Sequence, residues 1–571
     1  MKLLPRVKSF KKNGGALTVP SRVSVYFDDT RARDCTAGFA PYFARYKNVA
    51  CRLTDDKDGA DASFTKVDSP HPEYCKISIT GRIAVEYGDI AGARNAVSIL
   101  YRLLAKKKLP ECVIADYPDS AWRGVMLDVA RGYIEIGVVR RRLFEIALSR
   151  FNILHLHLMD SNGYALESGA LPDKSGGRYT KEEMRGIVAY AASLGIQIVP
   201  EIELPGHACF LLEKLPSLAC KSDKPSSWAV CVSNDGLYEF ADRLTGELAE
   251  IFDCEYIHVG ADELTWYDTG WPSLAWDTCE RCKELSRRNG YKAAADSRGY
   301  KVSADLFYYF VRRMHAILKK HNRRMMMWSD SVDISKPPDI PRDILIQFWR
   351  VAAPGRGPFD GCSFQRFLDE GFRVVNSDAL ETYADFYIRQ EQLMSWSPKE
   401  RPRHLPLEKD ELLGYIVWSP YVKPAFNPAA DGLIIGGEMP AFDVRGHFAY
   451  SLSPLISLFG DRLCNHDPLY AGDIDGLRLT RDILHADGFP ADLFGLFGGL
   501  VLITADGEAA IPPFVKDKQT FFKTRGRIAG KAKTAAARRA IGRLLRERPE
   551  DAEYIRPYAD CLDIMLAWDK P

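Results

Sequence analysis

The chain has 571 residues, and its 77 basic and 76 acidic side chains nearly cancel. This length exceeds the roughly 250–300 residues at which a single hydrophobic core stops growing, so we expect two or three domains. The near-neutral charge gives no electrostatic reason to expect a nucleic acid or a membrane surface as a partner.

The cysteines and the N-terminus bear on the compartment of the protein. The 13 cysteines are an odd number dispersed through predicted strands and helices, which is typical of reduced, buried thiols. Residues 1–8 lack the apolar core of a signal peptide, and the longest apolar run, 493–505, is far short of a membrane span of about 20 residues. These features favour a cytoplasmic protein, or an exported one from which a leader has been removed.

One pair of cysteines has a spacing found in metal sites. Two residues separate Cys279 from Cys282, which is half of the pattern of many zinc sites. Because the sequence contains no second pair with this spacing, we interpret it as a coincidence within a loop.

Residues 1–118 predict a small α/β domain. Short alternating strands such as 22–27 and 75–79 occur together with an amphipathic helix over about 90–104. The polar stretch 115–120 then predicts a domain junction.

Residues 119–460 predict a barrel, because strands alternate there with helices in the manner of parallel β/α units. The predicted strands are 122–129, 152–158, 196–202, 256–260, 324–329, 344–349, 373–377 and 433–438. The predicted helices are 137–150, 181–194, 236–252, 302–321, 364–371 and one near 445–458. Eight strands indicate a (β/α)8 TIM barrel whose active face is formed by the loops after the strands, with a doubly wound sheet as the alternative. Residues 461–571 predict a mainly helical C-terminal region.

Two adjacent carboxylates, Asp262 and Glu263, follow the apolar run 256–260. Neighbouring acids repel when both are ionised, so their surroundings can leave one as a proton donor and the other as a fixed anion. The alternative is structural: Asp262 would cap a following helix and Glu263 would favour its positive pole.

Further polar and aromatic residues fall at the other predicted strand ends. They are Arg123, Asp160, His207, Trp328, Trp349, Tyr383, Asp385, Phe442 and Asp443. Aromatic rings stack on the apolar faces of sugars, carboxylates and arginine bind their hydroxyls, and an acid pair can break an acetal. The combination at one face of a barrel indicates a saccharide site.

Four segments carry a resemblance to a known family. Residues Trp122–Arg131, His155–Asp160, Val199–Ala208 and His258–Glu263 resemble, in this order, the motifs of glycoside hydrolase family 20, the β-N-acetylhexosaminidases. The resemblance covers about residues 1–460, since a small α/β domain usually precedes the barrel in that family.

The resemblance implies an exo-acting, retaining glycosidase that removes terminal β-linked N-acetylglucosamine or N-acetylgalactosamine without a metal or organic cofactor. The substrate's own acetamido oxygen attacks the anomeric carbon, so that an oxazolinium ion forms and water opens it. Glu263 would be the general acid and then the base. Asp262 would orient the acetamido N–H and offset the developing positive charge, and Tyr383 would hydrogen-bond the acetamido oxygen.

The resemblance also assigns the sugar-binding residues. Those that would hold ring hydroxyls are Arg123, Asp160, Asp385 and Asp443. Trp328 and Trp349 would wall the acetamido pocket, Phe442 would belong to the sugar-binding wall, and His207 would support the acid pair. A sugar, as a small molecule, oligosaccharide or glycoconjugate, is therefore the expected partner, with oligomerisation left open.

Three departures from the family pattern leave alternatives open. Ala261 stands where the family has glycine, which is tolerable if φ stays negative. The segment 161–164 and the pair at 442–443 also differ from the family's sugar-binding wall, so a catalytically inactive sugar-binding barrel is the second hypothesis. A third is a metal-dependent hydrolase using His155, His157 and Asp160, because alternate residues of a strand share a face.

Overall fold

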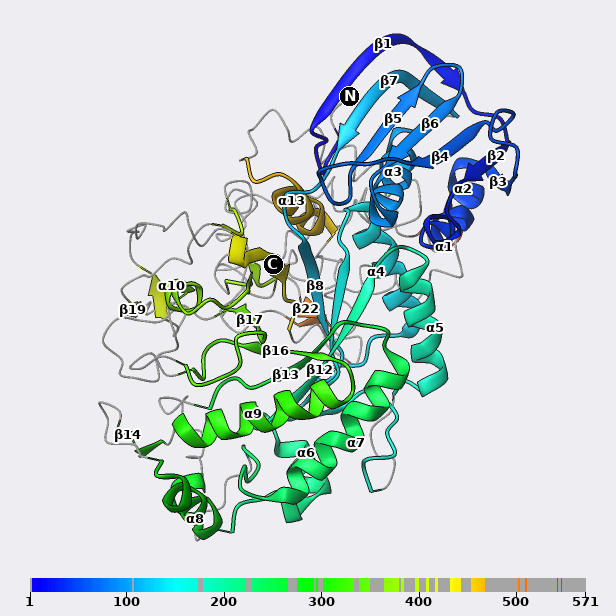
Figure 1. Cartoon of the computed structure of the whole chain (residues 1–571). Helices are drawn as coiled ribbons and strands as arrows, with labels where there is room; N and C mark the ends of the chain where they lie inside the picture. The colour runs from blue at the N-terminus through cyan, green and yellow to red at the C-terminus, as the bar shows by residue number, and fades with distance from the viewer. Residues whose placement is uncertain are drawn as a thin grey trace, which may run out of the picture.

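The structure is a computed structural model, in which an N-terminal sheet domain lies at one end of a barrel (Figure 1). Apart from a few short strands and isolated positions, the residues it describes are 3–104, 107–172, 178–221, 228–264, 275–291, 304–332, 338–349, 364–378, 382–384, 396–399, 432–442 and 453–467.

The N-terminal domain is a seven-stranded sheet in the order β1-β7-β5-β6-β4-β2-β3, with helices on the side facing the barrel (Figure 1). Its elements are β1 (Ser9–Thr18), β2 (Arg22–Phe27), α1 (Thr30–Asp34), α2 (Ala40–Lys47), β3 (Ala50–Leu53), β4 (Ala62–Lys66), β5 (Cys75–Ile79), β6 (Ile83–Tyr87), α3 (Ile90–Leu103) and β7 (Lys108–Asp116). Buried and partly exposed residues alternate along β5 and β6, as in a sheet with one covered face. The two strands and the helix predicted here are confirmed.

Eight parallel strands close the predicted barrel. They are β8 (Trp122–Asp128), β9 (Ile153–His157), β12 (Gln197–Leu204), β13 (Tyr256–Gly260), β16 (Arg324–Trp328), β17 (Leu345–Phe348), β18 (Val374–Asn376) and β21 (Ile434–Met439). Consecutive strands pair in parallel, and β21 returns to β8. The prediction of a (β/α)8 barrel preceded by an α/β domain is confirmed.

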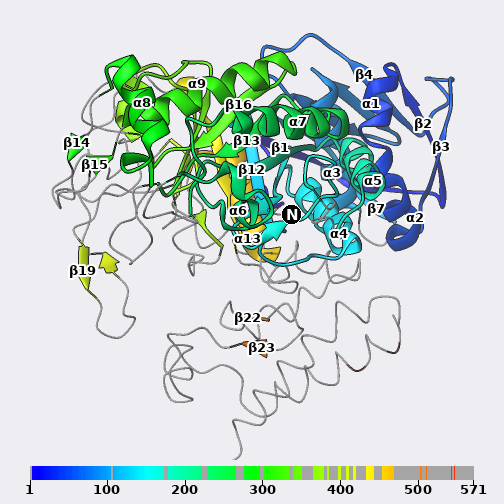
Figure 2. The same cartoon turned by 90° about the horizontal axis from the view of Figure 1, so that it is seen from below.

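Helices follow the barrel strands on the outside. They include α4 (Ile136–Leu148), α5 (Lys181–Ala192), α7 (Asp235–Ile251), α9 (Ala304–Lys320), α10 (Phe364–Asp369) and α13 (Ser453–Cys464). Figures 1 and 2 show α7 and α9 side by side. The sequence did not predict α6 (Cys209–Lys214) or α8 (Glu280–Asn289), which lie in the long excursions after β12 and β13. Beyond residue 467, the predicted helical C-terminal region lies almost entirely outside the described residues.

Buried ionic contacts join the N-terminal domain to the barrel. Glu73 accepts hydrogen bonds from both terminal nitrogens of Arg123 at the start of β8, at 2.5 and 3.0 Å. Arg94 of α3 donates to the carbonyl of Phe151 at 2.8 Å, just before β9. These contacts lie at the amino-terminal ends of the strands, so the N-terminal domain leaves the opposite face of the barrel open for a site.

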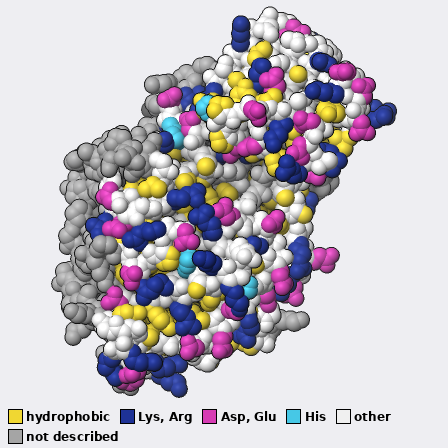
Figure 3. Space-filling view, viewed as in Figure 1, with side chains coloured by type: hydrophobic (Ala, Val, Ile, Leu, Met, Phe, Trp, Pro, Cys, Tyr) yellow, Lys and Arg dark blue, Asp and Glu magenta, His cyan; other side chains and the backbone are white. Residues whose placement is uncertain are grey.

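Charges of both signs are interspersed over the face shown in Figure 3, with no broad area of one sign among the described residues. Within the same described part of the chain, no helix has the length and apolar character needed to cross a membrane.

Candidate active site

The acid pair sits on an unusual backbone at the carboxyl end of β13. Gly260, Ala261 and Glu263 all have positive φ angles, of 66°, 67° and 50°. The condition under which an alanine fits here without strain, a negative φ, is therefore not met at Ala261. A side chain in the left-handed region costs about 1–2 kcal/mol, so the acid pair is held in a strained turn.

Hydrogen bonds from neighbouring segments hold this turn. The backbone N–H of Glu263 donates to Oδ2 of Asp330 at 3.0 Å, and that of Leu264 donates to Oγ of Ser331 at 3.3 Å. The indole N–H of Trp228 donates to the carbonyl of Glu263 at 3.2 Å. The end of β16 and the excursion after β12 thus fix the acid pair from two sides.

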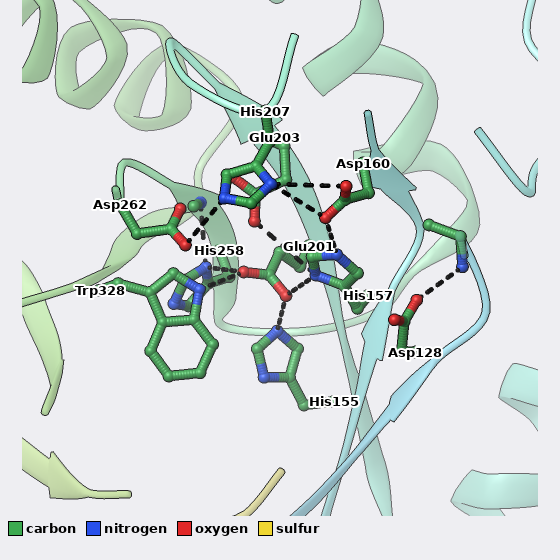
Figure 4. Close-up of polar contacts among 12 residues, drawn as sticks. Asp128, His155, His157, Asp160, Glu201, Glu203, His207, His258, Asp262 and Trp328 are labelled. Carbon is green, nitrogen blue, oxygen red and sulfur yellow. Dashed lines mark hydrogen bonds and ion pairs between the residues drawn. The ribbon is translucent and has the colours of Figure 1, made fainter. Parts of the chain in front are cut away.

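His207 lies between Asp262 and a further carboxylate, Asp160 (Figure 4), and it also contacts Glu263. Its Nε2 lies 3.5 Å from Oδ2 of Asp262 and 3.2 Å from Oε2 of Glu263, while its Nδ1 lies 3.3 Å from Oδ2 of Asp160. The ring packs against Trp228, with a centroid distance of 4.3 Å. This position, between both acids and Asp160, agrees with the predicted support of the acid pair.

Asp160 is the centre of a second group of contacts. It lies 2.6 Å from Nη2 of Arg131 and 2.9 Å from Nε2 of His157. Arg131 also pairs with Asp128 at 3.0 Å. Although burial acts against it, the hydrogen bonds from His157 and His207 hold the pKa of Asp160 well below its ordinary value. Asp160 is therefore an anion beside the acid pair, and it is paired with Arg131.

The arginine at this site is Arg131 and not Arg123, so the prediction that Arg123 holds ring hydroxyls is wrong. Arg123 is fully buried at the opposite end of β8, where it binds Glu73 and the carbonyl of Ser120. The sequence analysis missed Arg131 as a site residue. Its position, three residues after Asp128 and just beyond the predicted strand, indicated the active face of the barrel.

The predicted aromatic residues do come together. The Trp349 ring stacks on Tyr383 with centroids 6.0 Å apart and lies 6.5 Å from the Trp328 ring, while Phe442 lies 5.4 Å from Tyr383 and 6.0 Å from Trp328. Trp328 is 1% exposed, and its indole N–H donates to Glu201 at 2.7 Å, so it forms the floor of the cluster. Asp385 and Asp443 lie outside the described residues.

A buried polar layer lies inside the barrel below the aromatic cluster. Glu201 is its centre, with contacts to His155, His157 and His258 of 3.2, 2.5 and 2.8 Å (Figure 4). His155, His157 and Asp160 do not form one ligand set, because His155 groups with Glu201 and His258 whereas His157 groups with Asp160 and Glu203. The third hypothesis, a metal held by those three side chains, does not fit this geometry.

Burial and charge set the protonation of the acid pair's neighbours. Burial, opposed by His207 and reinforced by Asp330 and Glu263, raises the pKa of Asp262 to about 7. Burial and the charge of Asp262 raise the pKa of Glu203 well above its ordinary range. Burial alone would lower the pKa of His207, but Asp262 and the other carboxylates around it raise it well above its usual value. These shifts favour the protonated forms of His207 and Glu203 and place the pKa of Asp262 at about 7.

Comparison with known proteins identifies the family. Residues 120–411 match the catalytic domain of glycosyl hydrolase family 20, which is about half of the chain. The chain therefore belongs to glycosyl hydrolase family 20. It is similar to a beta-hexosaminidase of Vibrio furnissii, with 29% identity over 349 residues, which are 53% of this chain and 52% of the relative. A beta-hexosaminidase of Porphyromonas gingivalis is 26% identical over 379 residues, or 58% of this chain and 44% of the relative. The chain spans about half the length of the curated relatives it matches.

Solved structures share the fold. A family 20 exo beta-N-acetylglucosaminidase from Vibrio harveyi, in complex with N-acetylglucosamine, aligns with a TM-score of 0.69 at 21% identity over 85% of this chain and 77% of that one. A chitobiase from Flavobacterium johnsoniae aligns with a TM-score of 0.67 at 20% identity over 99% of this chain and 93% of that one.

Proposed function

We propose that the chain is an exo-acting, retaining glycosidase that hydrolyses terminal β-linked N-acetylglucosamine or N-acetylgalactosamine by substrate-assisted catalysis. The observation that carries the proposal is the acid pair of Asp262 and Glu263, which shares His207 beside a cluster of four aromatic rings. Family membership and relatives named beta-hexosaminidase support the same substrate class.

The surroundings of the two acids support different roles. Glu263 is partly exposed, so its carboxyl can reach the glycosidic oxygen and a water molecule, as a general acid and then base must. Asp262 is 8% exposed and has a pKa of about 7. Positive charge that develops on the acetamido group in the transition state favours its anionic form, so its stabilising effect is greatest there.

The remaining residues supply recognition. Trp349 and Tyr383 wall the acetamido pocket, and the Tyr383 hydroxyl hydrogen-bonds the acetamido oxygen. Arg131 and Asp160, whose side chains lie 2.6 Å apart, bind ring hydroxyls. A charged pair suits this role because the donor and the acceptor can each take one hydroxyl of a vicinal pair.

The test is hydrolysis of 4-nitrophenyl β-N-acetylglucosaminide and β-N-acetylgalactosaminide by the full chain. We expect turnover that Asp262→Asn and Glu263→Gln reduce unequally. Glu263→Gln retains more activity on substrates whose leaving group needs no proton, whereas Asp262→Asn does not. The matched control is Glu255→Gln, an exposed acid at the other end of β13 that pairs with Arg324. No turnover of either substrate would refute the proposal, and equal losses would refute the division of roles.

The second hypothesis, a catalytically inactive sugar-binding barrel, rested on departures such as Phe442 and Asp443, and it is not favoured by family membership or by relatives named beta-hexosaminidase. Calorimetry distinguishes the two. Binding of N-acetylglucosamine without hydrolysis of any hexosaminide would favour the inactive barrel.

We also propose a reducing, cytoplasmic location. The support is that all 11 cysteines among the described residues are free and that eight of them are buried. The comparison of the two substrates above will measure the gluco or galacto preference. Light scattering of the full chain will measure its oligomeric state.

A further inference from the structure

Four buried cysteines converge beside the candidate active site. Cys220 lies just after a short helix of the excursion that follows β12, and Cys231 lies just before α7. Cys279 and Cys282 begin α8 in the excursion that follows β13. Each is at most 4% exposed, and their four sulfur atoms all lie within 4.8 Å of one another.

We propose that these four cysteines form a structural tetrathiolate site for zinc. The interpretation of the Cys279 and Cys282 spacing as a coincidence rested on the lack of a second such pair. The sequence does lack a second such pair, but a site does not require one, because the fold brings Cys220 and Cys231, which are 11 positions apart, to the other two thiols.

The spacing of the sulfurs fits a zinc ion. Zinc–thiolate bonds of about 2.3 Å in a tetrahedron place neighbouring sulfurs about 3.8 Å apart. The sulfur of Cys231 lies 3.7 Å from that of Cys282 and 3.9 Å from that of Cys279, and Cys220 lies 4.0 Å from Cys282. A disulfide holds its sulfurs about 2.05 Å apart, so none of these three pairs of cysteines is joined by a disulfide.

The surroundings suit a site with net negative charge, since zinc with four thiolates carries two negative charges. The hydroxyl of Ser233 lies 3.3 Å from the sulfurs of both Cys231 and Cys282, within reach for donation to a thiolate. Arg281 stands between the two cysteines of α8 in sequence, and its Nη2 donates to the carbonyl of Ala219 at 3.1 Å, next to Cys220. Its buried Nε has no hydrogen-bond partner among the described residues. A guanidinium beside the thiols offsets part of the charge.

The site clamps two excursions that carry the acid pair and its support. The Cys231 N–H donates to the carbonyl of Leu218, and the Val230 N–H donates to the carbonyl of Pro205 just before His207. Trp228, three residues before Cys231, packs on His207 and binds the carbonyl of Glu263. Zinc would therefore tie the segment that positions His207 to the segment that follows Glu263.

The test uses the full chain, purified without a chelator. Elemental analysis and native mass spectrometry should find one zinc per chain, and denaturing mass spectrometry should find all cysteines reduced. Binding replaces four thiol protons, which pass to solvent, with one Zn²⁺. Replacement by Co²⁺ should give the intense visible bands and the near-ultraviolet charge-transfer band of four thiolates around one metal. A metal-free protein, an iron-loaded one, or a mass deficit from disulfides would each overturn the proposal.

Variants and exchange localise the metal. Cys231→Ser and Cys282→Ser should lose the zinc, while Cys254→Ser, a buried cysteine outside the cluster, should keep one equivalent. Retained zinc in both cluster variants would overturn the assignment of ligands.

Because these variants can fail to fold, zinc is also removed from the wild-type protein by a mercurial reagent and a chelator, and hydrogen exchange of the backbone amides is followed. Exchange in 228–234 should rise at least tenfold, with β5 unchanged. The metal assays are independent of whether the protein hydrolyses hexosaminides.

Discussion

The central electrostatic element of the site is the contact between His207 and Asp262, and its removal has a predictable effect. His207→Gln takes away a cation that favours ionised Asp262 while leaving a side chain of similar size. Asp262 must be ionised to offset charge in the transition state, so kcat/KM rises with pH as Asp262 loses its proton. In the wild type, this acid limb should lie near pH 7, since the pKa of Asp262 is about 7.

The size of the effect follows from the distance. Nε2 of His207 lies 3.5 Å from Oδ2 of Asp262. Unit charges about 4 Å apart attract by about 4 kcal/mol at an effective dielectric constant of about 20, which corresponds to about 3 in pKa. Water that enters next to glutamine screens part of this loss. The acid limb of the variant should therefore move to higher pH by roughly 1–3.

The assay is kcat/KM for a 4-nitrophenyl hexosaminide between pH 4 and 10, with released nitrophenol read after quenching at high pH. Glu255→Gln serves as the control and should keep the limb of the wild type. Thermal unfolding of each variant confirms that it is folded over the range used. An acid limb that stays in place in folded His207→Gln would refute the assignment of His207 as the cation that controls Asp262.

Other substitutions separate positions that the structure distinguishes. Ala261→Gly should stabilise the protein by about 1 kcal/mol in denaturant unfolding and keep activity, because it relieves a positive φ; destabilisation would contradict the strained turn. The pKa of Glu203 is higher in the folded than in the unfolded protein, so Glu203 opposes folding increasingly as pH rises above about 4.5. Glu203→Gln should therefore stabilise the protein at pH 8 and not at pH 4. Equal unfolding midpoints of wild type and variant at pH 8 would contradict a raised pKa of Glu203. Arg131→Ala should lower kcat/KM at least tenfold and destabilise the fold less than Arg123→Ala does, because Asp160 keeps its hydrogen bonds from His157 and His207; unchanged kinetics would contradict a role in binding. Arg123→Ala should instead destabilise the fold by about 3–5 kcal/mol, because buried Glu73 loses both of its hydrogen bonds from the guanidinium and keeps only Arg94 at 3.6 Å and Asn95 at 3.2 Å.

The barrel could be predicted from the sequence because each of its strands is a short apolar run separated by a helical pattern. That regularity also placed Asp262, Trp328 and Tyr383 at strand ends, where the barrel brings them together. It also placed Arg123 at the start of the predicted strand 122–129, away from the active face, so the assignment of Arg123 to the site rested on the resemblance alone. Arg123 lies at the start of β8, and Arg131 follows its end. Only the contact of Glu73 with Arg123 reveals that Arg123 belongs to a domain junction.

Backbone conformation and distant pairing were beyond prediction for a physical reason. The sign of φ at Ala261 depends on how Asp330 and Ser331 hold the turn after β13, and these contacts cross about 70 positions of sequence. The cysteine cluster likewise joins two excursions that follow different strands, β12 and β13. Periodicity reports local structure, so it carries no signal for either feature.

The strain at the acid pair and the cysteine cluster have a common explanation. His207, Ala261 and Glu263 all have positive φ, and such residues persist only where their surroundings hold them firmly. The two excursions that contain them are long, and long loops do not supply that rigidity by themselves. Trp228 bonds to one side of the strained turn and packs on His207, so its own position must be fixed. Buried residues of both excursions already pack around it, and the Trp276 indole N–H donates to the carbonyl of Val230. The proposed metal, held from both excursions three residues from Trp228, would add a fixed cross-link to this packing.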